Sequence, residues 1–178
     1  MAFVRLSFII PLLILLPVSG YSQKAAAGDW PMFNRDLAGT RYSPLTQINT
    51  TNVGKLTRAW HYAFEREGKT IKGDSPSELY QEITPIVVNG VMYLPAGDRV
   101  VALEPESGKE LWSYEVTGGL ASFRGVAYWQ GDKDNPPEIF AGTSDGHLIA
   151  LNAKTGKLVP GFGDEGSVNL RIGVAEKK

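Results

Sequence analysis

The sequence predicts an all-β chain made of β-propeller blades, and three observations lead to this prediction. The stretch VVALEPESGK (100–109) recurs as LIALNAKTGK (148–157), and every matched position is 48 residues apart. A fixed period of this size is typical of radial or stacked repeats. Each copy reads as an apolar strand, a turn rich in Asx, Ser, Thr and Gly, and the beginning of another strand. No segment shows sustained helical periodicity.

The length of the chain limits how much of a propeller it can contain. A blade takes about 40–50 residues and a closed ring needs at least about four blades, whereas the chain has 178 residues. Once a leader is set aside, there is room for roughly three blades. We therefore expect an incomplete ring, which is either the N-terminal portion of a longer protein or a chain that obtains its missing blades elsewhere.

The N-terminus has the layout of a secretory signal. Arg5 supplies a positive charge, an apolar stretch of 13 residues follows at 6–18, and small residues follow at 19, 20 and 22. This stretch is too short to span a bilayer comfortably, which disfavours an uncleaved membrane anchor. We expect a signal peptide over 1–22, a linker over 23–28 and the propeller portion over 29–178.

The expected elements of the mature chain begin with an irregular strap over 29–52. This segment is rich in turn formers and aromatic residues and should pack through its aromatics. A polar loop is expected at 65–78, and Asn89-Gly90 is a strong hairpin signal. Strands are expected at 52–62, 83–88, 91–94, 100–103, 110–116, 123–129, 139–141 and 147–151, after which the chain leads from Gly156 toward Phe162.

One large aromatic residue follows each Gly-Lys pair by a few positions. The three pairs with their aromatics are Gly54-Lys55 with Trp60, Gly108-Lys109 with Trp112, and Gly156-Lys157 with Phe162. This spacing favours one aromatic side chain per blade, packed against the neighbouring blade, over a surface on which a ligand stacks.

Composition excludes several classes of site. The chain has no cysteine, which excludes disulfides, thiolate metal sites and covalently held haem c within it. The net charge of −1 gives no indication of nucleic-acid binding. A histidine-based metal cluster is not expected, because the only histidines are His61 and His147. The group Asp132, Asp134 and Asn135 is interpreted as a solvated turn, since two prolines follow it and a calcium loop would need a later glutamate.

Several longer motifs carry a resemblance to a known family. They are Asp29-Trp30-Pro31 with Arg41-Tyr42-Ser43-Pro44-Leu45, Glu82-Ile83-Thr84-Pro85, Arg124-Gly125-Val126-Ala127-Tyr128, and Ser144-Asp145-Gly146-His147-Leu148. Together they resemble the quinoprotein dehydrogenases, which use pyrroloquinoline quinone (PQQ), over nearly the whole mature chain. Among the subgroups, the membrane-type glucose dehydrogenases look most similar.

The resemblance implies the N-terminal part of an eight-bladed propeller, with PQQ and a calcium ion near its axis. Members of the family oxidise alcohols or aldose sugars in the periplasm and pass electrons to a quinone or a cytochrome. The calcium ligands, the general-base aspartate and the tryptophan beneath the cofactor belong to later blades. We therefore expect this segment alone to be inactive.

Two cofactor-binding residues carry over by position. Glu82 matches the glutamate beside the cofactor, and Arg124 matches the arginine that pairs with its carboxylate and quinone oxygens. A forked, permanently charged guanidinium suits such oxygens. The apolar surroundings of Arg124 also suggest a buried charge that needs a partner, and Gly125 suggests close approach or a positive φ.

The chain departs from the family pattern on one side of the cofactor. Gly118-Gly119 stand where alcohol-oxidising members carry a cysteine pair, and Leu120 stands where glucose-oxidising members carry a histidine, so the substrate class stays open. The alternative function is a non-catalytic PQQ-like propeller that scaffolds envelope proteins. Such a scaffold would have no reason to keep Glu82, Arg124 and the N-terminal strap, and their joint presence favours the enzyme.

Overall fold

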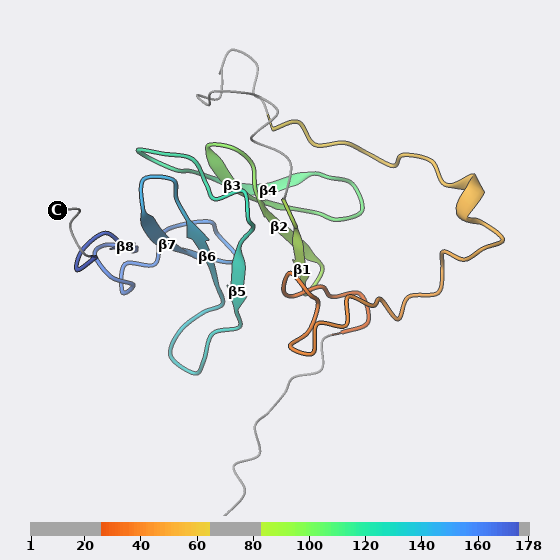
Figure 1. Cartoon of the computed structure of the whole chain (residues 1–178), viewed down its shortest axis with the longest axis horizontal. Helices are drawn as coiled ribbons and strands as arrows, with labels where there is room; N and C mark the ends of the chain where they lie inside the picture. Colours follow the sequence, from red (N-terminus) through yellow and green to blue (C-terminus); the bar gives the residue numbers. More distant parts are fainter. Residues whose placement is uncertain (1–25, 65–82, 175–178) are drawn as a thin grey trace, which may run out of the picture.

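The computed structural model describes residues 26–64 and 83–174 (Figure 1). These residues form one short 3-10 turn, η1 (Val53–Lys55), and strands only. Within these two ranges, no helix is long and apolar enough to cross a membrane. The strands are β1 (Ile86–Val88), β2 (Val91–Pro95), β3 (Arg99–Leu103), β4 (Glu110–Glu115), β5 (Ala127–Trp129), β6 (Glu138–Gly142), β7 (His147–Asn152) and β8 (Ser167–Asn169).

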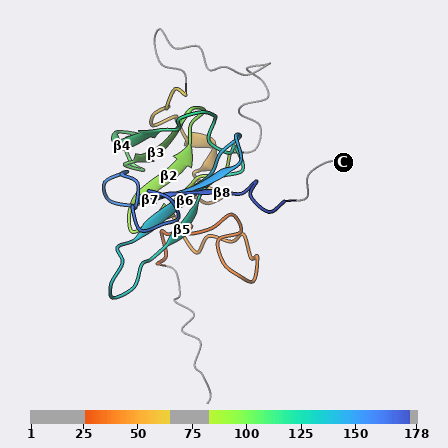
Figure 2. The same cartoon turned by 90° about the vertical axis from the view of Figure 1, so that its left-hand side faces the viewer.

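The strands make two four-stranded sheets, each with its strands in sequence order. One sheet is β1-β2-β3-β4 and the other is β5-β6-β7-β8, and every neighbouring pair is antiparallel. Each sheet is therefore one propeller blade, and the blades lie next to each other in both perpendicular views (Figures 1 and 2). The predicted all-β architecture with an incomplete ring is confirmed.

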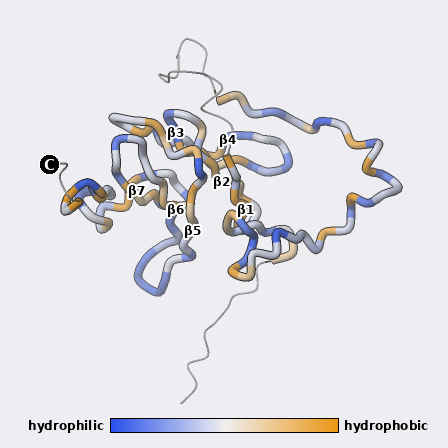
Figure 3. Tube along the Cα trace, in the orientation of Figure 1, coloured by the Kyte–Doolittle hydropathy of each residue, from blue (hydrophilic) through white to orange (hydrophobic). Residues whose placement is uncertain are grey.

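Apolar side chains from both blades form one continuous core between the sheets. Tyr93 and Val100 of the first blade belong to the same buried cluster as Ile139 and Leu151 of the second. Burial of this kind is the main stabilising contribution to a repeat protein, because a single blade cannot cover its own apolar face. The loop between β5 and β6 is hydrophilic by contrast (Figure 3), as expected for the solvated turn at 132–135.

The predicted packing of an aromatic residue against a neighbouring blade is found for Trp112, and Trp60 contacts the first blade in the same manner. The indole nitrogen of Trp112 donates to the carbonyl oxygen of Ala153 at 2.9 Å, and a Cβ on Gly156 would lie 2.5 Å from the Trp112 ring. Trp60 makes the same pair of contacts one repeat earlier, with the carbonyl oxygen of Pro105 at 3.0 Å and with Gly108. Each tryptophan therefore packs on the Gly-Lys turn of the following blade.

Phe162 differs from the two tryptophans. Its ring packs edge-on against Phe140 of β6, with the ring centroids 5.2 Å apart, so this contact lies within one blade. The last strand of the second blade also begins later than the sequence suggested, at Ser167.

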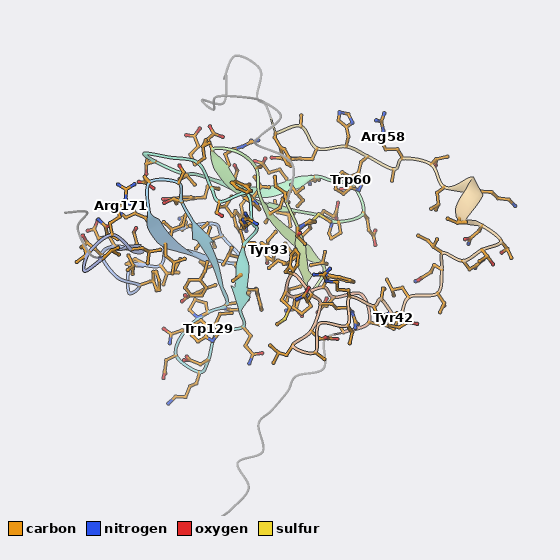
Figure 4. The ribbon with its side chains drawn as sticks, viewed as in Figure 1. Tyr42, Arg58, Trp60, Tyr93, Trp129 and Arg171 are labelled. Atoms are coloured by element: carbon orange, nitrogen blue, oxygen red, sulfur yellow. The ribbon has the colours of Figure 1, made fainter. Side chains whose placement is uncertain are left out.

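The strand predicted at 52–62 is not formed. Val53–Lys55 makes the 3-10 turn η1, and the following residues through Phe64 are assigned to no strand. A strand needs a neighbour for its backbone N–H and C=O groups, and none pairs with this segment among the residues that the structure describes. In Figure 4 the segment carries Arg58 and Trp60 along the edge of the first blade.

The strand predicted from residue 123 begins only at Ala127. Residues 122–126 instead form a turn, in which Gly125 has a φ of +112°. This conformation is incompatible with a regular strand.

The N-terminal strap contacts the first blade at its beginning and then leaves it. Trp30 and Val87 exchange two backbone hydrogen bonds of 2.7 and 3.0 Å, and the carboxylate of Asp29 accepts from the backbone N–H of Asn89. Phe33 and Tyr42 are exposed, so the expected packing through aromatics is only partly realised. The strap then arches away from both sheets (Figure 1). The predicted signal peptide at 1–22 lies outside the described residues.

The buried phenol of Tyr93 is expected to make the folded chain less stable as the pH rises above 10. Burial raises the pKa of its phenol to about 12 from an ordinary value of 10.0, and its hydroxyl donates to the carbonyl oxygen of Ala153 at 3.3 Å. Between these two pH values the unfolded chain has lost the proton and the folded chain has kept it. Stability therefore falls over this window, by about 2 kcal/mol at its upper end.

We expect Tyr93→Phe to reduce this alkaline loss, because phenylalanine has no proton to release. The measurement is the denaturant midpoint at a series of pH values from 9 to about 12. An equal loss in the wild type and the variant would show that other groups cause the alkaline sensitivity.

Candidate functional site

Arg124 lies on the turn that leads into β5, at the rim of the second blade. The structure places its side chain on the surface, with the guanidinium carbon 5.4 Å from the centroid of the Phe123 ring. The expectation of a buried charge is therefore wrong. The reason is that Phe123 is itself 42% exposed, so the neighbouring aromatic residue does not enclose the arginine. A rim position leaves the guanidinium accessible to a ligand.

Gly125 holds the Arg124 turn against the beginning of the first blade. Besides its φ of +112°, a Cβ at this position would lie 3.2 Å from the carbonyl oxygen of Thr84. Both reasons expected for this glycine, close approach and a positive φ, are thus present. Thr84 is two residues after Glu82 in the sequence, and Glu82 lies outside the described residues. The structure therefore brings Arg124 next to the segment that directly follows the other predicted site residue.

The run from Gly118 to Ser122 is hydrogen-bonded along the turn between β6 and β7. The backbone N–H of Leu120 donates to the Ser144 hydroxyl at 2.9 Å, and the backbone N–H of Ser144 donates to the Leu120 carbonyl oxygen, also at 2.9 Å. The backbone N–H of Ser122 donates to the carbonyl oxygen of Gly142 at 2.8 Å. The segment before Arg124 is therefore tied to the second blade at several points.

Close packing explains the glycines at 118 and 119. A Cβ on Gly119 would lie 2.8 Å from the Ser144 hydroxyl oxygen, and one on Gly118 would lie 3.2 Å from a carboxylate oxygen of Asp145. Gly118 also has a φ of +85°. A side chain at Gly119 would require the Ser144 hydroxyl to shift, and one at Gly118 would be strained by the positive φ.

Asp145 links the side chains of this turn. One carboxylate oxygen accepts from the Thr143 hydroxyl and the other lies 3.1 Å from Nδ1 of His147. The hydrogen bond from Thr143 is the main reason that the pKa of Asp145 lies below its usual value, and the charge of His147 adds to it, while burial opposes both. The aspartate is thus held ionised and oriented.

A cavity of about 290 Å³ lies between the two blades near this turn. Its apolar wall includes Tyr114 and Leu158, and its polar rim includes Asp145, His147 and Glu165. Arg124 does not line it. Sequence reasoning did not identify this cavity, because its walls come from β4, β7 and the segment before β8. In the described part of the chain, no three His, Asp or Glu side chains are grouped as metal ligands would be.

Comparisons with known proteins agree with the geometry. Residues 30–178 match the family model "PQQ: Glucose/ethanol/alcohol dehydrogenase, beta-propeller domain". The chain is 46% identical over 142 residues to the dehydrogenase subunit of the quinone alcohol dehydrogenase of Gluconobacter oxydans, which covers 74% of this chain and 16% of that protein. It is 36% identical over 166 residues to the quinoprotein glucose dehydrogenase of Escherichia coli, which covers 84% and 20%.

Solved structures show the same similarity. Quinohemoprotein alcohol dehydrogenase from Comamonas testosteroni superposes with a TM-score of 0.60 at 34% identity, over 83% of this chain and 20% of that one. A europium-containing methanol dehydrogenase superposes with a TM-score of 0.56, also at 34% identity, over 74% and 22%. The chain therefore spans about a fifth of the length of these relatives.

Proposed function

The chain belongs to the family of PQQ-dependent glucose, ethanol and alcohol dehydrogenases with a β-propeller domain, and on this premise we propose that it is the N-terminal portion of an enzyme that oxidises alcohols or aldose sugars. The observation that carries the proposal is the contact of the Arg124 turn with Thr84, through Gly125. This contact joins the two segments that bear Arg124 and Glu82. A scaffold propeller would have no need to hold these two segments together.

The chemistry of Arg124 fits the proposed cofactor. PQQ carries three carboxylates and an ortho-quinone, and when bound it supplies the quinone that takes up the electrons from the substrate. Arg124 is exposed at the rim and permanently charged, so it can offer two parallel N–H donors to one carboxylate or to a quinone oxygen. Its position over the Phe123 ring restrains the guanidinium before the cofactor arrives.

We assign two roles to residues of this chain. Arg124 binds and orients the cofactor, and it stabilises negative charge that develops on the cofactor's oxygens. Glu82 accepts hydrogen bonds from the cofactor and fixes its orientation from the side of the first blade. The residue that takes the substrate's hydroxyl proton is proposed to lie beyond Lys178.

A metal ion is part of the proposal, and its ligands are expected outside this chain. Calcium suits the oxygen ligands of such a site and would polarise an oxygen of the cofactor as a Lewis acid. One similar protein of known structure is a methanol dehydrogenase that contains europium, so a lanthanide is the alternative to calcium. The metal content of the purified enzyme decides between these ions.

Further blades of the complete protein are the nearest proposed partners. Trp60 contacts the first blade as Trp112 contacts the second, so residues 56–64 would be the outer strand of a preceding blade whose other strands come from beyond this chain. We propose the periplasm as the location, because the N-terminus resembles a secretory signal. A quinone or a cytochrome is the proposed electron acceptor, as in the names of two relatives.

The test is Arg124→Ala in the protein expressed from the complete gene. We expect the affinity for PQQ to fall at least about tenfold, because a charged hydrogen bond is lost. Affinity is measured by PQQ titration of the apoprotein, and alcohol and aldose oxidation by dye reduction. Lys133→Ala is the control for the loss of one exposed positive charge, since Lys133 lies in the solvated turn at 132–135 and its side chain is 89% exposed. Equal titration curves for wild type and Arg124→Ala would refute this site, and a protein that binds no PQQ would favour the scaffold.

A further inference from the structure

The turn between β6 and β7 is hydrogen-bonded to residues 120–122, which precede Arg124. Ser144 contributes two hydrogen bonds to Leu120, one through its hydroxyl and one through its backbone N–H. An isolated bridge pairs Ala121 with Thr143, and Ser122 donates to Gly142. These contacts join residues that are 20 to 24 positions apart in the sequence.

We propose that Ser144 is a positioning residue for the cofactor site and that it acts through Arg124. The inference rests on the function proposed above, in which Arg124 binds PQQ. Ser144 makes no contact with the cofactor in this account. Its role is to fix the position of residues 118–122 at the rim of the second blade. This position in turn determines where the Arg124 guanidinium meets the ligand.

The connection from Ser144 to Arg124 is short and made of backbone contacts. Leu120, which both groups of Ser144 bind, precedes Arg124 by four residues. Ser122 lies between them, and its hydroxyl accepts from the backbone N–H of Arg124 at 3.4 Å, while its carbonyl oxygen accepts from Gly125 at 3.4 Å. A shift of Leu120 is therefore passed along the three residues 121–123 to the Arg124 turn, which Ser122 holds by these two hydrogen bonds.

The backbone of Gly119 also lies close to the Ser144 hydroxyl, at a position where a side chain would not fit without a shift of that hydroxyl. Gly119 approaches the Ser144 hydroxyl so closely that its missing Cβ would lie 2.8 Å from the oxygen. On the turn itself, Asp145 is held by the Thr143 hydroxyl and by His147. Ser144 is thus the residue of this hydrogen-bonded turn that binds Leu120, and the run before Arg124 is positioned against the turn.

The first blade offers a control serine at the opposite end of its strands. The Ser107 hydroxyl also accepts a backbone N–H in a turn, that of Lys109 at 3.1 Å, and Ser107 is exposed as Ser144 is. Ser107 lies between β3 and β4, whereas the turns after β2 and β6 lie at the rim of Arg124, as the hydrogen bond from Ala121 to Gly97 indicates. Ser107→Ala removes a hydroxyl that accepts a backbone N–H, far from the site, and it also removes the hydrogen bond that this hydroxyl donates to the Glu104 carboxylate.

The experiment compares Ser144→Ala, Ser107→Ala, Arg124→Ala and the double variant Ser144→Ala/Arg124→Ala in the complete protein. The readout is the dissociation constant for PQQ from quenching of tryptophan fluorescence, which needs no turnover, together with the denaturant midpoint of each apoprotein. We expect Ser144→Ala to weaken binding about three- to tenfold, the range for one neutral hydrogen bond. Ser107→Ala should change binding less than about twofold, with a similar midpoint.

The double variant separates positioning from a general loss of stability. If Ser144 acts through Arg124, the double variant binds PQQ as Arg124→Ala does, because the two effects are not additive in one network. Additive losses would overturn the inference, and so would unchanged binding by Ser144→Ala when Arg124→Ala binds weakly; both leave the proposed function intact. Unchanged binding by Arg124→Ala would instead refute the proposed function, and with it the inference.

Discussion

Gly156→Ala is expected to lower the free energy of unfolding by about 3 kcal/mol, because it combines backbone strain with a clash. Gly156 has a φ of +68°, which L-residues adopt only at a cost. A Cβ there would lie 2.5 Å from Cε3 and 2.7 Å from Cδ2 of Trp112, so it would overlap the indole ring. The indole cannot move away from the turn without loss of a hydrogen bond, because its ring N–H donates to the carbonyl oxygen of Ala153. The measurement is equilibrium unfolding in denaturant.

Gly161→Ala is the matched control for this substitution. Gly161 is exposed, and nothing lies within 4 Å of the Cβ that alanine would add. We expect its free energy of unfolding to stay within about 0.5 kcal/mol of the wild type. Similar losses for the two variants would show that the contact between Trp112 and the Gly-Lys turn does not hold the blades together.

Trp112→Ala is expected to destabilise the protein by about 3 kcal/mol or more, as removal of a large packed aromatic residue generally does. Trp112 stands on β4 of the first blade and packs against the second blade at Gly156 and Ala153. Its ring also lies 5.9 Å from the Tyr93 ring in the shared core. The substitution opens space between the blades and leaves the Ala153 carbonyl oxygen without this donor. The loss is measured as a lower denaturant midpoint.

Trp129→Ala provides the comparison for this loss. Trp129 is 36% exposed on β5 and lies apart from Tyr93 in Figure 4, so we expect a loss of only about 1 kcal/mol. The double variant Gly156→Ala/Trp112→Ala adds a second check. Alanine at 156 has no indole to clash with in that background, so its additional cost should shrink to the backbone strain alone. A full additional cost would mean that Trp112 and Gly156 are not coupled.

Much of the blade architecture was predictable from local pattern. The 48-residue repeat indicated two equivalent units, and the Asn89-Gly90 pair indicated the hairpin that joins β1 and β2. The packing of Trp112 against the neighbouring blade also followed from spacing, because a repeat places equivalent residues at equivalent interfaces, whereas its contact with the Gly-Lys turn was seen only in the structure. The prediction of a strand at 52–62 was wrong because a strand also needs a partner. Its apolar pattern was present, but strand formation depends on a partner that pattern does not supply.

The candidate site was predictable in part. The sequence suggested that the backbone requires a glycine at position 125, either for close approach or for a positive φ. The structure shows both, a positive φ and close approach to Thr84. Arg124 was expected to be buried because its sequence neighbours are apolar, yet the turn places it on the surface. The hydrogen bonds between Ser144 and Leu120 could not be foreseen, because they join different strand connections.

By itself, the sequence determined the secondary structure of the blades, the repeat that relates them and the family to which they belong. These properties depend on residues close together in the chain, whose conformational preferences and periodicity are local. Only the tertiary structure decided where Arg124 lies, why Gly118 and Gly119 carry no side chains, and that the turn at Ser144 supports the run before Arg124. Such features arise from contacts between blades and turns, which exist only once the apolar faces of two sheets have packed together.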